Sequence, residues 1–191
     1  GVAAIGISNY HDFGVYPRFA AAAAEAGVVP LFGVEIITLI DDLPDGGTLV
    51  NDPTNLNRMY LCGKAITRLD PPSPSAARQM ARLRAASDER MRQMTTRVAA
   101  RFAQAGLDGG GTDEQIAAAV AERCGVPIGW VALQERHVAQ AFQELLFRDV
   151  VPDDRAALLG LLFEAPTSVD TTDAVAVQEA IRSNLMKAGK P

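Results

Sequence analysis

Residues 2–40 read VAAIGISNYHDFGVYPRFAAAAAEAGVVPLFGVEIITLI. The apolar run over residues 2–8 predicts a strand that is covered on both faces, and a polar turn follows it. Pro17 suits the first turn of a helix, and the alanine-rich segment after it favours a helix that Gly27 ends. Residues 28–40 predict a second strand. Two strands joined by a helix form a right-handed parallel crossover, so this stretch predicts an α/β fold.

Further strand signals follow this stretch. Residues 58–66 predict a third strand, and residues 48–50 are compatible with a small one before it. The proline-rich segment at residues 69–74 cannot continue a sheet. We therefore expect two domains, an α/β part over residues 1–70 and a helical part over residues 71–191.

The second half of the chain predicts helices. The longest is expected over residues 75–105, where apolar side chains recur at three- and four-residue steps. Its other faces are rich in arginine, which indicates either a phosphate-binding surface or an ordinary solvated face. The absence of interleaved aromatic residues favours the solvated face. Thr112 is a candidate N-cap for the next helix, and further helices are expected over residues 131–147, 152–164 and 168–188.

Composition narrows the function classes. The chain has 191 residues, of which 48% are hydrophobic and 21% charged, with a net charge of -5. These values are typical of a folded globular protein and disfavour a nucleic-acid or anionic-membrane partner. No apolar run reaches the ~18 residues that a membrane span requires. Cys62 and Cys124 cannot build a disulfide framework or a cysteine-based zinc site, and a cytoplasmic location is the default expectation.

The candidates for chemistry follow or lie within the predicted strands. In the turn after the first strand, His11 and Asp12 offer adjacent nitrogen and oxygen donors for zinc, manganese or iron. The alternative is an ordinary turn, in which such residues are common. Glu35 lies inside the second strand, where a carboxyl group is costly unless it is protonated, hydrogen-bonded or bound to a metal. Function in α/β folds sits at the carboxyl ends of strands, so we expect these residues at one edge of the sheet.

The opening stretch resembles the PHP (polymerase and histidinol phosphatase) family. The likeness rests on AAIGISNYHDFG and VVPLFGVEII, and extends to RMYLCGKAI and to two short motifs, ERHVAQAFQELLF and LMKAGKP. The resemblance implies part of a distorted β/α barrel followed by a helical insertion. It implies that the first family strand lies before Gly1 and the last strands beyond Pro191. It also implies a phosphoesterase that acts on small phosphorylated substrates through a metal-activated water.

Residue by residue, the resemblance is uneven. Glu35 stands where the family has its metal-bridging glutamate. The Asp-His pair of the family falls on Asn9 and Tyr10, and the histidine of its next strand falls on Tyr60. Tyrosine is a weak ligand for zinc or manganese at neutral pH, because its pKa is about 10. His137 matches a histidine of an insertion motif, where a helix cap or a packing role is the simplest interpretation.

The predicted site therefore has three donor residues and three lining residues. The donors are expected to take part in catalysis and to bind a divalent metal weakly. The donors are His11, Asp12 and Glu35, and the lining residues are Asn9, Tyr10 and Tyr60. Two functions remain open. One is a PHP-type phosphoesterase with a reduced metal site, and the other is a non-catalytic PHP descendant that acts as a binding or scaffold domain. An open sheet leaves unpaired edges, so we also expect further chain segments or a partner chain to cover them.

Overall fold

The computed structural model describes residues 1–40, 48–51, 56–67 and 73–187. The predicted boundary at residues 69–74 falls mostly outside the described residues, as does the predicted helix end at residue 188. The chain divides into two compact units, Gly1–Ala86 and Ser87–Pro191.

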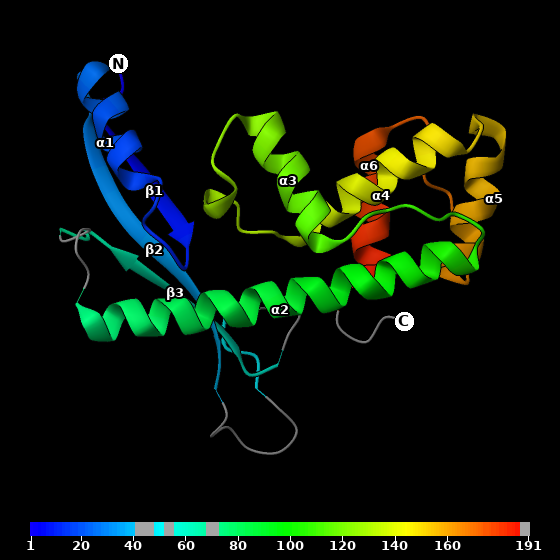
Figure 1. Cartoon of the computed structure of the whole chain (residues 1–191), viewed down its shortest axis with the longest axis horizontal. Coiled ribbons are helices and arrows are strands. Elements are labelled where there is room, and N and C mark those ends of the chain that lie inside the picture. Colours follow the sequence, from blue (N-terminus) through cyan, green and yellow to red (C-terminus); the bar gives the residue numbers. More distant parts are fainter. Residues whose placement is uncertain (41–47, 52–55, 68–72, 188–191) are drawn as a thin grey trace. The chain divides into compact units, whose positions relative to one another are not determined.

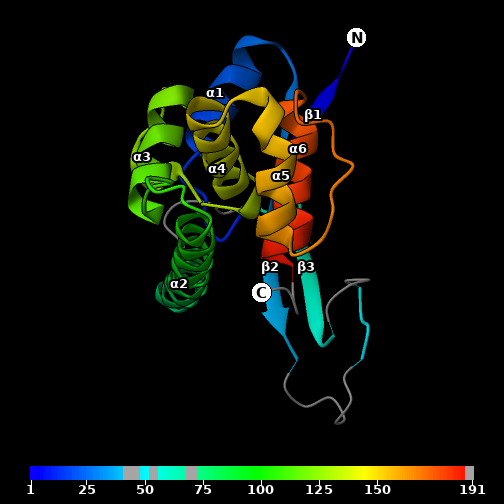
Figure 2. The same ribbon diagram turned by 90° about the vertical axis from the view of Figure 1, so that its right-hand side faces the viewer.

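The first unit contains a three-stranded sheet in the order β1-β2-β3 (Figures 1 and 2). The strands are β1 at Ala4–Tyr10, β2 at Val29–Leu39 and β3 at Arg58–Lys64. β1 and β2 are parallel and are joined by helix α1, Tyr16–Glu25, whereas β2 and β3 are antiparallel. The predicted crossover is therefore present. The described sheet is open, so a mixed α/β architecture is confirmed and a barrel is not shown.

Two details of the first unit differ from the sequence prediction. β1 extends through Asn9 and Tyr10, because these residues pair with Val34 and Glu35 on β2. They therefore belong to the strand and not to the predicted turn. Residues 48–50 form no strand.

Helix α1 packs on β2 through aromatic rings. Tyr16 is fully buried and stacks on Phe32 with ring centroids 5.5 Å apart, and Phe19 meets the same ring edge-on at 6.0 Å. Pro17 lies in the first turn of the helix, and Gly27 after its end has a φ of 67°, as the sequence predicts.

The prediction that the strands are covered on both faces is wrong for the described residues. Apolar side chains of β1 and β2 are about half exposed, at 44% for Ile5, 59% for Val29 and 52% for Leu31. Leu31 alternates with Phe32, which faces α1, so it lies on the opposite face of the sheet. A continuous apolar run shows that both faces of a strand carry apolar side chains. It does not show which segments cover those faces.

The second unit is helical. Helix α2 spans both units, and the described residues from 74 to 187 contain no strand, as predicted. The elements are α2 at Pro74–Gln104, α3 at Asp113–Cys124, a 3-10 turn η1 at Ile128–Trp130, α4 at Glu135–Asp149, α5 at Pro152–Phe163, α6 at Ala174–Ile181 and a π-turn η2 at Arg182–Met186. Among these helices, none in the described part of the chain combines the length and apolar character needed to cross a bilayer.

Helix α4 begins four residues later than the predicted start at Val131. Gln134 caps it, because its side chain and that of His137 exchange hydrogen bonds with each other's backbone. A reciprocal cap fixes the first turn of a helix, so the preceding residues stay extended.

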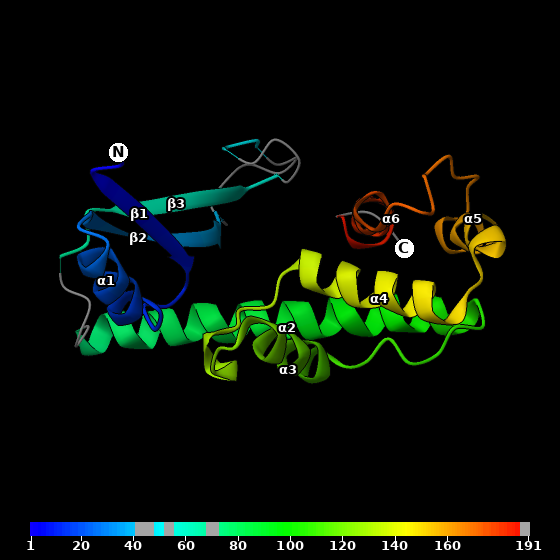
Figure 3. The same ribbon diagram turned by 90° about the horizontal axis from the view of Figure 1, so that it is seen from above.

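The core of this unit is built on the predicted apolar stripe of α2. Met91, Val98 and Phe102 are 1% exposed or less, and α4 packs along this half of α2 (Figure 3). The rings of Phe102 and Phe142 lie 4.8 Å apart. Burial of each such side chain contributes about 1.5–3 kcal/mol, so this contact anchors α4 to α2. The other members of the core include Val138, Leu146, Leu159, Leu162, Val177 and Ile181.

Candidate functional site

Tyr10 and Glu35 lie directly opposite each other in the parallel pair of β1 and β2. The Tyr10 hydroxyl donates a hydrogen bond to Oε1 of Glu35 at 2.7 Å. Side chains that face each other across a sheet lie on the same side of it. Glu35 alternates with Val34, which is 8% exposed on the α1 side, so both residues of the pair lie on the face away from α1. Of the arrangements that the sequence analysis left open for this carboxyl group, a hydrogen bond is present.

The chain changes direction at His11. Its φ is 57°, a left-handed conformation that is uncommon outside glycine, although His, Asn and Asp adopt it more often than other residues. The side chain is 6% exposed, and its ring lies 5.9 Å from that of Tyr10. Its backbone N–H donates to the carbonyl of Glu35 at 3.4 Å. This turn ends the strand.

Both carboxylate oxygens of Asp12 are hydrogen-bonded. Oδ1 accepts from Nδ2 of Asn9 at 3.1 Å and from the backbone N–H of Gly14 at 3.0 Å. Oδ2 pairs with Nη1 of Arg84 at 3.2 Å, and the two side chains are 23% and 24% exposed. The sequence shows an arginine-rich helix but not which arginine reaches this turn. Arg84 is thus a residue of the site that sequence reasoning missed.

A second tyrosine fixes the base of the turn. The Tyr16 hydroxyl donates to the carbonyl oxygen of Gly33 and accepts from the backbone N–H of Asn9 at 2.9 Å. Burial raises the pKa of this hydroxyl, the hydrogen bond from Asn9 lowers it, and the negative charge of Asp12 raises it. Tyr16 therefore ties the end of β1 to β2 as a neutral phenol.

Tyr60 is not the residue of β3 that lies opposite Glu35. It faces Ile37 on β2, and Cys62 is the residue that faces Glu35. Arg58 lies over the Tyr60 ring, 5.3 Å from its centroid. Tyr60 and Glu35 thus share a face but are not cross-strand partners, and Cys62 takes that position.

The predicted donors do not assemble into a metal site by themselves. A catalytic zinc-type site uses three protein ligands. In the described ranges of the chain, no group of three His, Cys, Asp or Glu side chains could hold a metal ion. Asp12 is committed to Arg84 and to the turn, and one oxygen of Glu35 is committed to Tyr10. The metal roles of His11, Asp12 and Glu35 stay a prediction.

His137 caps a helix, in agreement with the simplest interpretation of this residue in the sequence. Its Nδ1 accepts a hydrogen bond from the backbone N–H of Gln134 at 3.1 Å. Burial lowers its pKa, and the positive charges of Arg136 and Arg123 lower it further. The imidazole is therefore held in its neutral form at the start of α4.

Several arginines of α2 are paired with carboxylates. Arg90 lies 3.3 Å from Glu135, and Arg92 binds Glu89 through two of its nitrogens, which lowers the pKa of Glu89 to about 2. Together with the pair of Arg84 and Asp12, these contacts reduce the positive charge that the helix presents. They support the solvated-face interpretation, and the absence of a nucleic-acid partner stays a prediction.

The fold of this chain is similar to that of a known crystal structure. No protein-family profile matches the chain, and no curated protein matches it. A crystal structure of a candidate metal-dependent phosphoesterase from Bifidobacterium adolescentis is similar, with a TM-score of 0.49 and 20% identity. The match covers 94% of this chain and 54% of that one, so the chain spans about half the length of that protein.

Proposed function

We propose that this chain is part of a PHP-type metal-dependent phosphoesterase that acts on a small phosphorylated substrate. The observation that carries the proposal is Glu35. Its carboxylate lies on the middle strand, on the sheet face that α1 does not cover, in the strand where the PHP resemblance expects a bridging glutamate. The described residues supply too few donors for a metal centre, so the proposal requires ligands from outside the described residues.

The neighbours of Glu35 have positioning roles in this proposal. Tyr10 holds one carboxylate oxygen through the 2.7 Å hydrogen bond and thereby orients the other. Arg84 holds Asp12, which fixes the turn after β1. Tyr60 and Cys62 line the same face beside Glu35.

The test is hydrolysis of p-nitrophenyl phosphate by the full-length gene product, purified without chelator and assayed with zinc, manganese or iron. Glu35→Gln should reduce activity by roughly tenfold to a hundredfold or more, since even outer residues of metal sites have effects of that size. Glu25→Gln is the matched control, because Glu25 is exposed at the end of α1. Equal activity of the two variants would contradict the proposal.

A second function has an observation of its own in its favour. Tyr10 and Arg84 provide a phenol and a guanidinium to Glu35 and Asp12, and these donors satisfy carboxylates without a metal. This arrangement favours a non-catalytic PHP descendant that serves as a binding or scaffold domain. It predicts a full-length protein that is folded, carries no stoichiometric metal by mass spectrometry, and does not hydrolyse the ester. Stoichiometric metal that Glu35→Gln releases would instead support the enzyme.

A further inference from the structure

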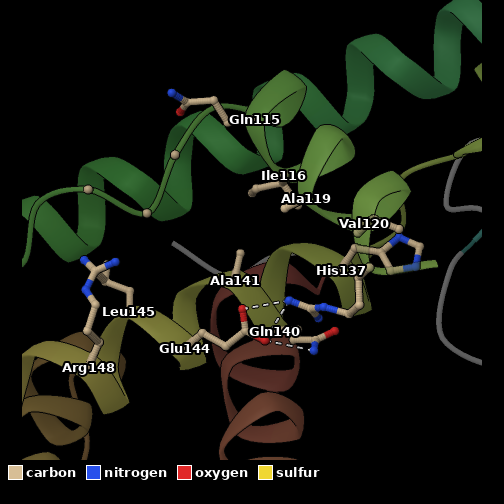
Figure 4. A pocket seen from close by; sticks show the side chains of 14 residues that line it. Gln115, Ile116, Ala119, Val120, His137, Gln140, Ala141, Glu144, Leu145 and Arg148 are labelled. Atoms are coloured by element: carbon tan, nitrogen blue, oxygen red, sulfur yellow. Dashed lines mark hydrogen bonds and ion pairs between the residues drawn. The ribbon is translucent and has the colours of Figure 1, made fainter. Parts of the chain in front are cut away.

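A pocket of about 260 Å³ opens between α3 and α4 in the second unit (Figure 4). Ile116 and Leu145 form its buried apolar floor, at 4% and 2% exposure. Ala119 from α3 and Ala141 from α4 face the same space, and their small side chains leave it open. The size and the apolar floor suit a small organic molecule.

Hydrogen-bond donors surround this floor. Arg148 lies against the glycine loop at residues 109–111, because a Cβ atom on Gly109 would be 3.9 Å from its Nη2. In the described part of the chain, none of the three backbone amides of this loop donates a hydrogen bond. His137 accepts the Gln134 N–H at Nδ1, so its neutral ring carries the proton on Nε2 and can donate there. The rim therefore favours a ligand that brings acceptors.

Packing and backbone conformation explain why residues 109–111 are glycines. Neither explanation involves the N–H groups of these residues. A Cβ atom on Gly110 would lie 2.0 Å from a ring carbon of Phe142, so only glycine fits there. Gly109 and Gly111 have φ values of 101° and 84°, which favour glycine as well. The close approach of the loop to the core thus accounts for the glycines, and the N–H groups remain available to a ligand.

The charges at the rim are held only by exposed ion pairs. Nε and Nη2 of Arg148 donate to the two carboxylate oxygens of its chain neighbour Asp149 at 2.6 and 2.7 Å, and Arg123 binds Glu144 at 3.0 Å. The arginine side chains are 65% and 47% exposed. The pair with Asp149 uses one N–H of Nε and one of Nη2, so the Arg148 guanidinium keeps its other N–H donors for an anion. The lining contains these two arginines and one carboxylate, that of Glu144.

We propose that this pocket binds a small organic anion, with its carboxylate or phosphate group between Arg148 and the glycine loop and its apolar body on Ile116 and Leu145. A guanidinium and backbone amides without another partner are both common donors to such groups. The proposal goes beyond the phosphoesterase function, because the pocket contains no residue of the sheet.

The test is an NMR titration of the full chain with phenylphosphonate, which has an anionic head and an apolar ring and cannot be hydrolysed as an ester. The amide signals of residues 109–111 should shift and saturate. Arg148→Gln should weaken binding by about tenfold or more, as expected for loss of a charged hydrogen bond. Arg97→Gln is the matched control, because Arg97 is exposed on α2 and does not line the pocket. Ala119→Leu should also weaken binding, since it fills the cavity.

Two smaller compounds test the anionic head and the apolar body of the ligand separately. Inorganic phosphate tests the head and benzyl alcohol tests the body, and each should bind at least about tenfold more weakly than phenylphosphonate. Equal affinity for phosphate alone, or no effect of Arg148→Gln, would overturn the proposal. Glu35→Gln should leave the binding unchanged. Shifts confined to the surroundings of Glu35 would refute the pocket while supporting the site in the first unit.

Discussion

Tyr10 and Glu35 face each other across the parallel strands β1 and β2, and the Tyr10 hydroxyl donates to Oε1 of Glu35 at 2.7 Å. A carboxylate within a strand is costly unless a donor satisfies it. The phenol of Tyr10 is such a donor, and it sits where the PHP resemblance expects a histidine. The behaviour of this pair therefore bears on both proposed functions.

Removal of the Tyr10 hydroxyl should destabilise the first unit. Tyr10→Phe should lower the free energy of unfolding by about 1–3 kcal/mol, because it leaves Glu35 without this donor. The measurement is urea denaturation followed by circular dichroism. Tyr60→Phe is the matched control, since in the described residues the Tyr60 hydroxyl makes no hydrogen bond. Equal losses in both variants would show that the hydroxyl of Tyr10 contributes nothing specific.

The ion pair of Arg84 and Asp12 should be coupled in a double-mutant cycle. The side chains are 24% and 23% exposed, so we expect a coupling energy of about 1 kcal/mol, at the upper end of the range for exposed pairs. The variants are Arg84→Gln and Asp12→Asn, alone and combined. The coupling should shrink in about 1 M salt because ions screen partly exposed charges. Additive effects of the single variants would contradict a direct interaction.

Chelators should not affect the stability of the 191-residue chain. Asp12 and one oxygen of Glu35 are bound by protein donors, and the described residues form no group of three metal-ligating side chains, so the melting temperature with EDTA should match that without it. Differential scanning fluorimetry measures this directly. A melting temperature that falls with EDTA and is restored by zinc would show that the chain does hold a metal.

The second unit should lose stability as the pH falls below about 6.5. Burial lowers the pKa of His137 in the folded state, so the unfolded state binds more protons between the two pKa values. The stability from neutral His137 is thus complete above the unfolded pKa and is lost as the pH falls towards the folded one. Urea midpoints between pH 7.5 and about 5.5 measure this. His137→Gln keeps an acceptor for the Gln134 N–H and should flatten the dependence, and an unchanged slope would refute the assignment.

Gly110→Ala should destabilise the helical unit by about 1–3 kcal/mol, the usual cost of overpacking. The new methyl group would lie 2.0 Å from the Phe142 ring, which is fully buried. Gly129→Ala is the matched control, because a Cβ atom there has no neighbour within 4 Å. Thermal melts of both variants give the comparison. A neutral effect of Gly110→Ala would mean that the loop can move away from the core.

Local patterns explain why much of the fold could be predicted. The crossover of β1, α1 and β2 and the long helix α2 follow from hydrophobic periodicity, proline and glycine, which act over a few residues. Helix α4 starts later than predicted because Gln134 and His137 together form a reciprocal cap. A search for Ser, Thr or Asp caps does not detect this pairing.

The candidate site was harder to predict because its contacts are long-range. Glu35 stood out as a carboxylate in an apolar strand, but its hydroxyl partner is 25 residues away and the arginine of Asp12 is 72 residues away. Strand register decides which residue of β3 lies opposite Glu35, and a shift of two residues exchanges one candidate for another on the same face. The register here puts Cys62 and not Tyr60 opposite Glu35.

That register makes Cys62 a natural attachment point for a spectroscopic reporter. Its thiol is exposed and faces the position of Glu35 across the strand pair, and Cys124, the other cysteine, is exposed as well. In a Cys124→Ser background, a fluorophore on Cys62 would sit next to the carboxylate and follow its surroundings in real time. Metal or phosphate added to the full-length protein could then be monitored optically, with Glu35 and Tyr10 left unchanged.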